Sequence, residues 1–256
     1  MAIYWAVVFT ILGMVFGSFF NVLSDRLPAR KSIIAPPSHC PQCGIKLKIF
    51  DLIPVFSYIF LHGRCRYCGA SIPKRVFLVE LTTGAIFLVL YLFFGLSTEL
   101  GIGLFYFSVL LLILITDLEH QLILNIIIYP VAIIVLVINA LTPSLSFTPA
   151  FFNGLLGGGV GLVLFLLIFL VSRGGIGLGD VKMAGLMGLM LGLPGVLVGI
   201  FIGIVVGGIV ASVALLTKRK KGRQAIPFGP FLSLGTMAAL LWGQNILDWY
   251  LGFFSF

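Results

Sequence analysis

Long apolar stretches separated by short polar breaks follow one another along almost the whole chain. A helix needs about 20 apolar residues to cross a hydrocarbon core of roughly 30 Å, and eight stretches are candidates, of which the sixth is short. The predicted spans are residues 2–24, 76–95, 101–118, 121–141, 151–172, 181–193, 196–217 and 226–250. Turns without Lys or Arg separate several of them, at Leu96–Glu99, Thr142–Ser144 and Leu193–Gly195. The pattern predicts an all-α polytopic membrane protein.

The composition excludes an ordinary soluble domain. Apolar residues make up 60% of the 256 residues and charged residues 9%, with a mean hydropathy of +1.20, whereas a soluble domain has about 25% charged residues. The first apolar stretch, from Met1 to about Val22, has no basic segment before it and no small-residue cleavage site. We therefore expect a retained transmembrane helix rather than a signal peptide.

The positions of the basic residues predict the topology. All sixteen Lys and Arg lie in residues 25–75, 173–182 and 217–224. Eight spans with the N-terminus outside place these three segments in the cytoplasm, as the positive-inside rule requires. The net charge of +8 is thereby explained without a nucleic acid partner. The predicted organisation is a first transmembrane helix (1–24), a cytoplasmic loop (25–75) and a membrane domain (76–256), with both termini outside.

The four cysteines form two C-x-x-C pairs in the predicted cytoplasmic loop. They are Cys40, Cys43, Cys65 and Cys68, and a glycine follows each pair. Two such pairs about twenty residues apart favour a structural Zn²⁺ site with four thiolates and no open position for water. Two disulfides are the alternative, which a reducing cytoplasm disfavours. A redox-active dithiol is a second alternative.

Eight acidic residues occur in the chain, so any acid within an apolar span needs an explanation. Four of them are expected in solvated or interfacial positions: Asp25, Asp51, Glu99 and Asp248. Asp117 ends the third span and Asp180 begins the sixth, at the same predicted depth on the cytoplasmic side. Two neighbouring carboxyl groups share a proton, so one takes a proton from water while the other protonates a carbonyl oxygen.

The segment before Asp180 is rich in glycine, which would let the backbone approach a substrate strand closely. These residues are Gly174, Gly175, Gly177 and Gly179. The alternatives for Asp180 are a solvated turn or an ion pair with Lys182 or Arg173. Spacing alone leaves the carboxylate pair and these alternatives open.

Several motifs in order give the chain its resemblance to the bacterial type IV prepilin peptidases, also called leader peptidase/N-methyltransferases. The motifs include the two cysteine pairs and the following segments: Gly17–Val22, Asp25–Pro28, Asp51–Val55, Gly63–Arg66, Val79–Gly84, Asp117–Gln121, Gly177–Lys182 and Pro227–Leu232. Each is weak alone, but the ordered set is specific and covers most of the chain.

The resemblance implies that Asp117 and Asp180 are the catalytic pair of an intramembrane aspartic peptidase. It implies prepilin or pseudopilin substrates that are cleaved at the cytoplasmic face of the bacterial inner membrane. Members with the four-cysteine loop usually also methylate the new N-terminus with S-adenosylmethionine. One departure stands out: the family commonly has Ile-Pro-Asp or Leu-Pro-Asp where this chain has Ile123-Leu124-Asn125, so the start of the fourth span is expected to differ.

Four further polar residues have open roles. Glu80 is a candidate for the methyltransferase site, with an ion pair to Lys74 or Arg75 as the alternative. Glu119 and His120 either tune Asp117 or contact the leader, or they are simply solvated. Asn21 is expected to form an interhelical hydrogen bond.

Three other classes of protein compete with the prepilin peptidase. A proton-coupled transporter would use the two aspartates as a relay, although transport sites usually lie near the bilayer midplane. A structural subunit with a zinc-bound platform would tolerate Asn at both positions. A presenilin-type protease shares Gly-x-Gly-Asp but does not account for the cysteine loop.

Overall fold

The computed structural model describes residues 1–142, 148–172, 175–217 and 227–253. In these residues the chain is helical, without β-strands, and two isolated β-bridges occur in the cysteine loop. The helices are α1 (Ala2–Arg26), a 3-10 turn η1 (Ile49–Leu52), α2 (Phe56–Phe60), α3 (Lys74–Phe94), α4 (Thr98–His120), α5 (Asn125–Leu141), α6 (Phe151–Val171), α7 (Leu178–Leu216) and α8 (Gly229–Gly252). The all-α prediction is confirmed.

Five of the described helices are long and apolar enough to cross a membrane: α1, α3, α4, α6 and α7. α5 is apolar but has 17 residues, and α8 is not among the five. The helices nevertheless coincide closely with the predicted apolar stretches, the sixth and seventh of which both lie in α7. The number of spans and the side on which the termini lie remain predictions. Arg173, Gly174 and the basic run Lys218–Lys221 lie outside the described residues.

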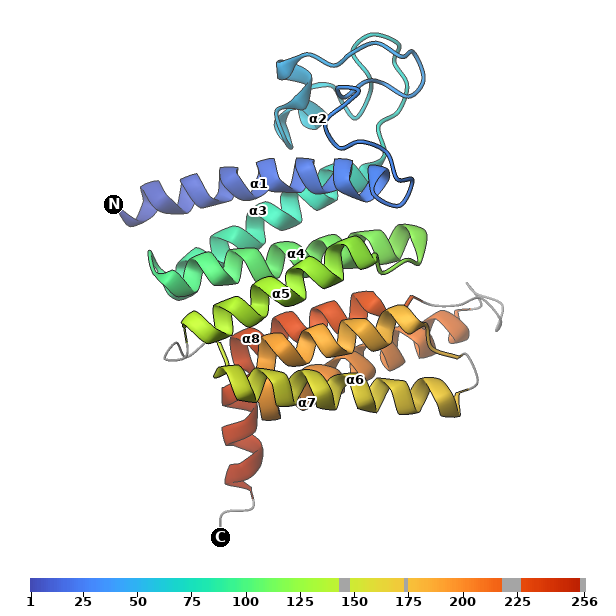
Figure 1. Ribbon diagram of the computed structural model, residues 1–256. Helices are drawn as coiled ribbons and strands as arrows, with labels where there is room; N and C mark the ends of the chain where they lie inside the picture. Colours follow the sequence, from blue (N-terminus) through green and yellow to red (C-terminus); the bar gives the residue numbers. More distant parts are fainter. Residues whose placement is uncertain (143–147, 173–174, 218–226, 254–256) are drawn as a thin grey trace. The chain divides into compact units, whose positions relative to one another are not determined.

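The chain divides into two compact units, the first of which is Met1–Ser108. Within it α1 packs along α3, and the cysteine loop forms a lobe beside the C-terminal half of α1 (Figure 1). Gly13 and Gly17 allow this close approach, because a Cβ at Gly17 would lie 2.7 Å from the Cα of Glu80. Small residues at helix contacts are typical of membrane proteins, where dispersion forces rather than the hydrophobic effect hold helices together.

The second unit, from Val109 onward, is built around α7, which packs against α5, α6 and α8. Glycines again face each other, since a Cβ at Gly157 would lie 2.6 Å from the carbonyl oxygen of Gly188. α7 therefore contacts α6 almost backbone to backbone. This close contact fixes the position of the α7 N-terminus relative to its neighbours in the unit.

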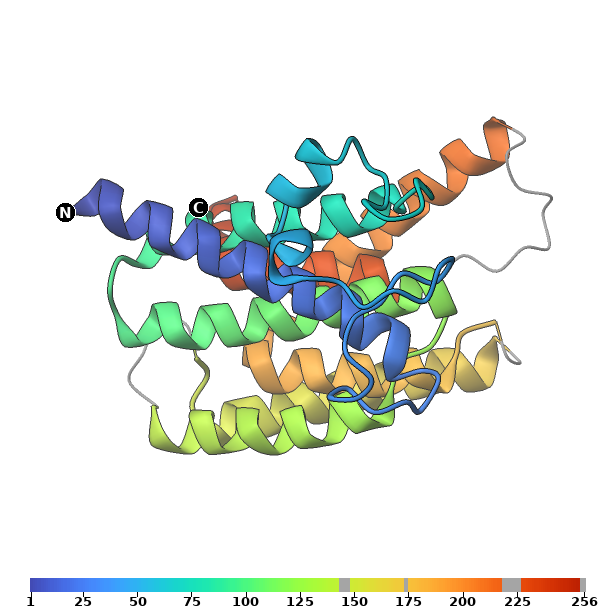
Figure 2. The same ribbon diagram turned by 90° about the horizontal axis from the view of Figure 1, so that it is seen from above.

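α7 is broken near its middle, where the predicted turn lies. Gly192 adopts φ 62° and Leu193 an extended conformation, and Pro194 follows. Asn153 on α6 repairs the break: its side chain accepts from the N–H of Leu193 at 2.9 Å and donates to the Leu193 carbonyl at 3.0 Å. Backbone groups freed in a bilayer need such partners. The two segments of α7 run in different directions (Figure 2).

Candidate active site and metal centre

Asp117 lies in the last turn of α4 and is 5% exposed. α4 ends just beyond it, where Gln121 adopts φ 53°. The carboxylate Oδ2 of Asp117 accepts a hydrogen bond of 3.0 Å from the N–H of Gly229, the first residue of α8. The first N–H groups of a helix have no intrahelical acceptor and carry partial positive charge. The start of α8 thus provides a donor for a carboxylate buried at the end of another helix.

Asp180 lies in the first turn of α7 and is partly buried. Its Oδ2 accepts a hydrogen bond of 3.2 Å from the N–H of Gly177, the residue before the helix. An acid at this position complements the positive end of the helix dipole. Each aspartate therefore interacts with a free N–H at a helix N-terminus.

The surroundings of the two carboxyl groups meet at Ile123, in the turn before α5. Ile123 packs against Gly179, the residue before Asp180, and against Gly229, the residue that donates to Asp117. A Cβ at Gly179 would lie 3.0 Å from the Cβ of Ile123, and one at Gly229 would lie 3.2 Å from its Cδ1. The two glycines let Ile123 reach both sides of the site. Sequence reasoning noted the motif around Gly229 but missed both its hydrogen bond and the role of Ile123.

Lys182 does not form the ion pair with Asp180 that sequence reasoning kept as an alternative. Its Nζ donates to the Oδ1 of Asn125 at 2.8 Å and lies 5.6 Å from the centre of the Tyr129 ring. Leu124 and Asn125 are the residues that depart from the family pattern, where proline and aspartate are common, and α5 begins at Asn125 with Leu124 as its N-cap. The side chain of Lys182 thus links α7 to α5 and leaves Asp180 free of its charge. The other suggested partner, Arg173, lies outside the described residues.

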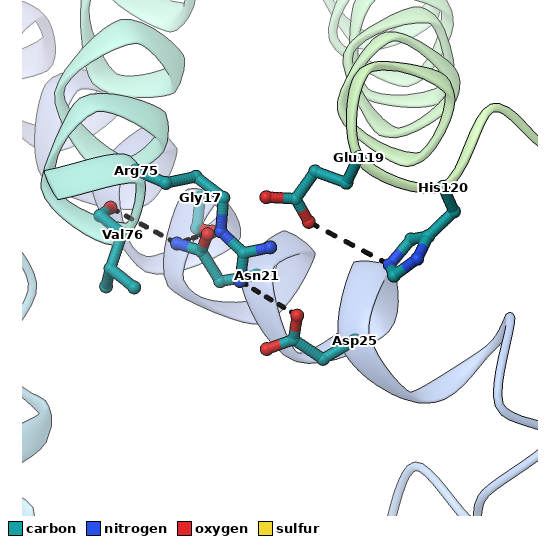
Figure 3. A network of polar contacts seen from close by, with 7 residues as sticks. All are labelled: Gly17, Asn21, Asp25, Arg75, Val76, Glu119 and His120. Atoms are coloured by element: carbon teal, nitrogen blue, oxygen red, sulfur yellow. Dashed lines mark hydrogen bonds and ion pairs between the residues drawn. The ribbon is translucent and has the colours of Figure 1, made fainter. Parts of the chain in front are cut away.

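Glu119 and His120 follow Asp117 and point away from the core. The Nε2 of His120 lies 3.9 Å from the Oε2 of Glu119, and both side chains are partly exposed (Figure 3). A pair this long and this exposed contributes little to stability. The exposure of both side chains agrees with one of the expected alternatives, a solvated position near Asp117.

The cysteine loop consists of two halves that fold in the same way. In each half, the N–H of the first cysteine bonds to a carbonyl five residues later, and the glycine after the second cysteine bonds back to the first cysteine. The bonds are Cys40 to Ile45 (3.0 Å), Cys65 to Ala70 (2.7 Å), Gly44 to Cys40 (2.9 Å) and Gly69 to Cys65 (2.9 Å). Gly44 and Gly69 have φ of 69° and 72°, a conformation that favours glycine.

The four cysteines are free thiols whose Sγ atoms all lie within 4.8 Å of one another. The Sγ atoms of Cys40 and Cys68 are 3.8 Å apart. A tetrahedral site with Zn–S bonds of about 2.3 Å has edges of about 3.8 Å. Hydrogen bonds from the backbone of Cys43 and Gln42 lower the pKa of Cys40 to about 6, whereas burial and the other three thiols raise the pKa of Cys68 to about 12. The donor set fits a metal ion, and the disulfide alternative does not match the structure.

Asp51 is not solvated, which was one of the two positions expected for it, since its side chain is 3% exposed. It accepts from the Nε of Arg66 at 2.6 Å, from the hydroxyl of Tyr67 at 2.9 Å and from the N–H of Lys48 at 3.1 Å. Burial raises the pKa of Asp51, but these hydrogen bonds outweigh it and hold the pKa below its usual value. Asp51 therefore ties the segment between the pairs to the second cysteine turn.

Glu80 is buried in α3, with 4% exposure. Its Oε2 accepts a hydrogen bond of 2.7 Å from the N–H of Val55, a buried residue in the loop that adopts φ 64°. The proposed partner Arg75 instead pairs with Asp25 at 2.9 Å (Figure 3). Glu80 thus connects α3 to the loop by a hydrogen bond rather than by an ion pair.

Asn21 forms the expected interhelical hydrogen bond. Its Nδ2 donates to the carbonyl of Val76 on α3 and to that of Gly17, both at 3.2 Å (Figure 3). Asn21 and Glu80 both line a partly open cavity of about 330 Å³, whose walls come from α1, the start of α3 and the cysteine loop. Sequence reasoning did not predict this cavity, because its walls come from three separate segments.

The fold defines a helical membrane protein with two aspartates at helix ends and a loop whose four cysteines could hold a metal ion. Two family models match the chain: the bacterial peptidase A24 N-terminal domain over residues 11–94, and the type IV leader peptidase family over residues 104–212. The chain belongs to the type IV leader peptidase family.

Curated relatives agree over nearly the full length. A prepilin leader peptidase/N-methyltransferase of Bacillus subtilis is 33% identical, with 94% of this chain and 96% of the relative aligned. Proteins of the same name from Stutzerimonas stutzeri and Pseudomonas aeruginosa are each 30% identical over 95% and 96% of this chain and 92% and 93% of the relative. No solved structure matches the chain.

Proposed function

We propose that this chain is a bifunctional enzyme, an aspartic endopeptidase that removes the leader of type IV prepilins or pseudopilins and then N-methylates the new N-terminus. The observation that supports the peptidase half is the position of Asp117 and Asp180 at the ends of α4 and α7, with Ile123 packed against a residue beside each. Its relatives carry both activities in their name.

The proposed cleavage uses the two aspartates in complementary protonation states. Because two close carboxyl groups do not both ionise readily, one proton is shared between them. The ionised carboxyl takes a proton from water as the water attacks the scissile carbonyl carbon. The protonated carboxyl gives its proton to the carbonyl oxygen. The N–H groups of Gly229 and Gly177 hold the two carboxylates in position through this exchange.

In the cysteine loop we propose one Zn²⁺ held by Cys40, Cys43, Cys65 and Cys68. Four thiolates fill a tetrahedral site, so the ion provides no open position for a reacting group and acts on structure alone. It would hold together two turns that bury few side chains of their own.

The proposed location is the bacterial inner membrane, with the aspartates and the cysteine loop at the cytoplasmic face. The distribution of Lys and Arg supports this orientation. The substrate would place its basic leader in the cytoplasm and its apolar stem in the bilayer. A division into a first transmembrane helix (1–24), a zinc-binding loop (25–75) and a peptidase domain (76–256) follows from the same orientation.

The test uses the purified full-length chain in lipid, incubated with a prepilin and S-adenosylmethionine, with the product N-terminus read by mass spectrometry. Asp117→Asn and Asp180→Asn are each expected to abolish leader removal while the protein stays folded. Glu99→Gln, which changes an acid at the other end of α4, is the matched control. Normal cleavage by both Asn variants would sink the assignment of the peptidase to these residues and favour a transporter or a structural subunit.

A further inference from the structure

The cavity of about 330 Å³ in the first unit has a polar floor that its own neighbours do not satisfy. Asn21 is 5% exposed, and its Oδ1 has no hydrogen-bond partner among the described residues, although its Nδ2 has two. A buried acceptor without a donor is costly, so it points to a donor that arrives with a ligand.

Glu80 places a carboxylate on the wall of the same cavity. It is 4% exposed and accepts hydrogen bonds from the N–H of Val55, through Oε2, and from the side chain of Ser18, which also lines the cavity. A buried carboxylate is normally paired with a cation, and neither of these donors is one. The cationic side chain of Arg75, which also lines the cavity, is paired with Asp25. The cavity therefore presents Glu80 and Asn21 as acceptors for a ligand that is cationic and carries N–H groups.

The rest of the wall suits a ligand with an apolar, planar part. Leu52, Tyr58 and Leu61 from the loop and Val22 and Val76 from the helices line the space. Pockets for small ligands combine such apolar walls with a few placed polar groups, and start at about 300 Å³. Cys40 and Cys65 also line the cavity, so the metal-binding turns form part of it.

We infer that this cavity binds the methyl donor S-adenosylmethionine, with its sulfonium and ammonium end toward Glu80 and Asn21. The inference rests on the proposed methyltransferase function and adds its binding site. S-adenosylmethionine has the features the cavity selects, namely a sulfonium cation, an ammonium group with N–H donors and a planar adenine.

The position of Glu80 also suits the transfer itself. The lone pair of the neutral N-terminal amine attacks the methyl carbon, the carbon–sulfur bond breaks, and its electron pair stays on sulfur as S-adenosylhomocysteine forms. The methylated ammonium then loses a proton, which the Glu80 carboxylate accepts. The step balances, because the donor supplies the methyl group, the amine supplies the electron pair and the Glu80 carboxylate accepts the released proton.

The test measures binding of radiolabelled S-adenosylmethionine to the full-length protein in lipid, beside leader removal and methylation of a prepilin. Glu80→Gln keeps the shape of the side chain but removes its charge. It is expected to weaken donor binding by about tenfold or more and to leave leader removal unchanged. Glu99→Gln, an acid that does not line the cavity, serves as the control.

Photo-crosslinking of the bound donor to the wild-type protein gives a second readout that does not depend on a variant's folding. The label is expected on peptides from residues 18–25, 52–61 or 72–80. If the wild type methylates but the label is confined to other segments, the assignment of this cavity is overturned. Unchanged donor binding by Glu80→Gln would overturn it as well. A wild type that cleaves the leader but neither binds the donor nor methylates would overturn the proposed methyltransferase and the inference together.

Discussion

The backbone N–H of Gly229 donates a hydrogen bond of 3.0 Å to the Oδ2 of Asp117, across 112 residues of sequence. A Cβ at Gly229 would lie 2.6 Å from that same oxygen. The absence of a side chain at Gly229 is therefore what lets the start of α8 approach the carboxylate.

Gly229→Ala is expected to slow leader removal by about 100-fold, the loss that a displacement of about 1 Å in an active site can cause. The carboxylate of Asp117 can rotate away from the added methyl group, so the protein should still fold. The measurement is kcat with a prepilin in lipid, together with the melting temperature.

The matched control for this variant is Gly159→Ala in α6, where a Cβ would meet no atom within 4 Å. It should cleave at the wild-type rate. Equal rates for the two variants would show that the contact between Gly229 and Asp117 does not matter for catalysis.

Removal of the metal is expected to separate the two proposed activities. The four cysteines of the two turns are close enough to hold one ion, and both turns contribute walls to the cavity. A strong chelator, or Cys65→Ser, should abolish methylation and donor binding, whereas leader removal should persist. Elemental analysis should find about one zinc per chain before chelation, and cleavage lost in parallel with zinc would contradict the separation.

Asp51→Asn is expected to loosen the cysteine loop at neutral pH, because it removes the charge from three hydrogen bonds. Burial, followed by the hydrogen bond to Asp51, raises the pKa of Tyr67, so its hydroxyl remains a donor. Amide hydrogen exchange in residues 46–70 should quicken several-fold relative to wild type.

The pH dependence of the difference in hydrogen exchange between wild type and Asp51→Asn follows from the direction in which the pKa of Asp51 is shifted. The folded pKa of Asp51 is lowered, so its stabilisation is fully present above the unfolded value of about 3.9 and is lost only as pH falls through the folded pKa. The difference in exchange free energy between wild type and Asp51→Asn should thus stay constant from about pH 6 to about pH 9. A difference that changes steadily over this range would argue that Asp51 is not the group responsible.

Asn125→Asp restores the acid common in the family and converts the hydrogen bond from Lys182 into an ion pair. Because the pair is exposed, the expected gain is about 0.2–1 kcal/mol in stability, with leader removal unchanged. The gain is measured as the difference in the free energy of unfolding among Asn125→Asp, Lys182→Met and wild type. A loss of activity in Asn125→Asp would indicate that a carboxylate here perturbs the aspartates instead.

Much of this structure could be predicted from the sequence, because a lipid bilayer and a metal site each place requirements on residues that are close together in sequence. Apolar length predicts the helices, since backbone polar groups in a bilayer must bond within their own segment. The spacing of the cysteines predicts four neighbouring thiols, because each turn brings two ligands together within four residues. The isolated acids Asp117 and Asp180 were likewise visible as exceptions in apolar surroundings.

Only the tertiary structure decided which long-range partners these residues meet. The burial of Asp51, the link from Lys182 to Asn125, the acceptor role of Glu80 and the donor role of Gly229 all join segments far apart in sequence. Contacts between helices depend on how closely the helices pack, and here glycines that face the backbone of a neighbouring helix set that distance. The cavity beside Asn21 also could not be predicted, because three separate segments form its walls and no local pattern encodes the space between them.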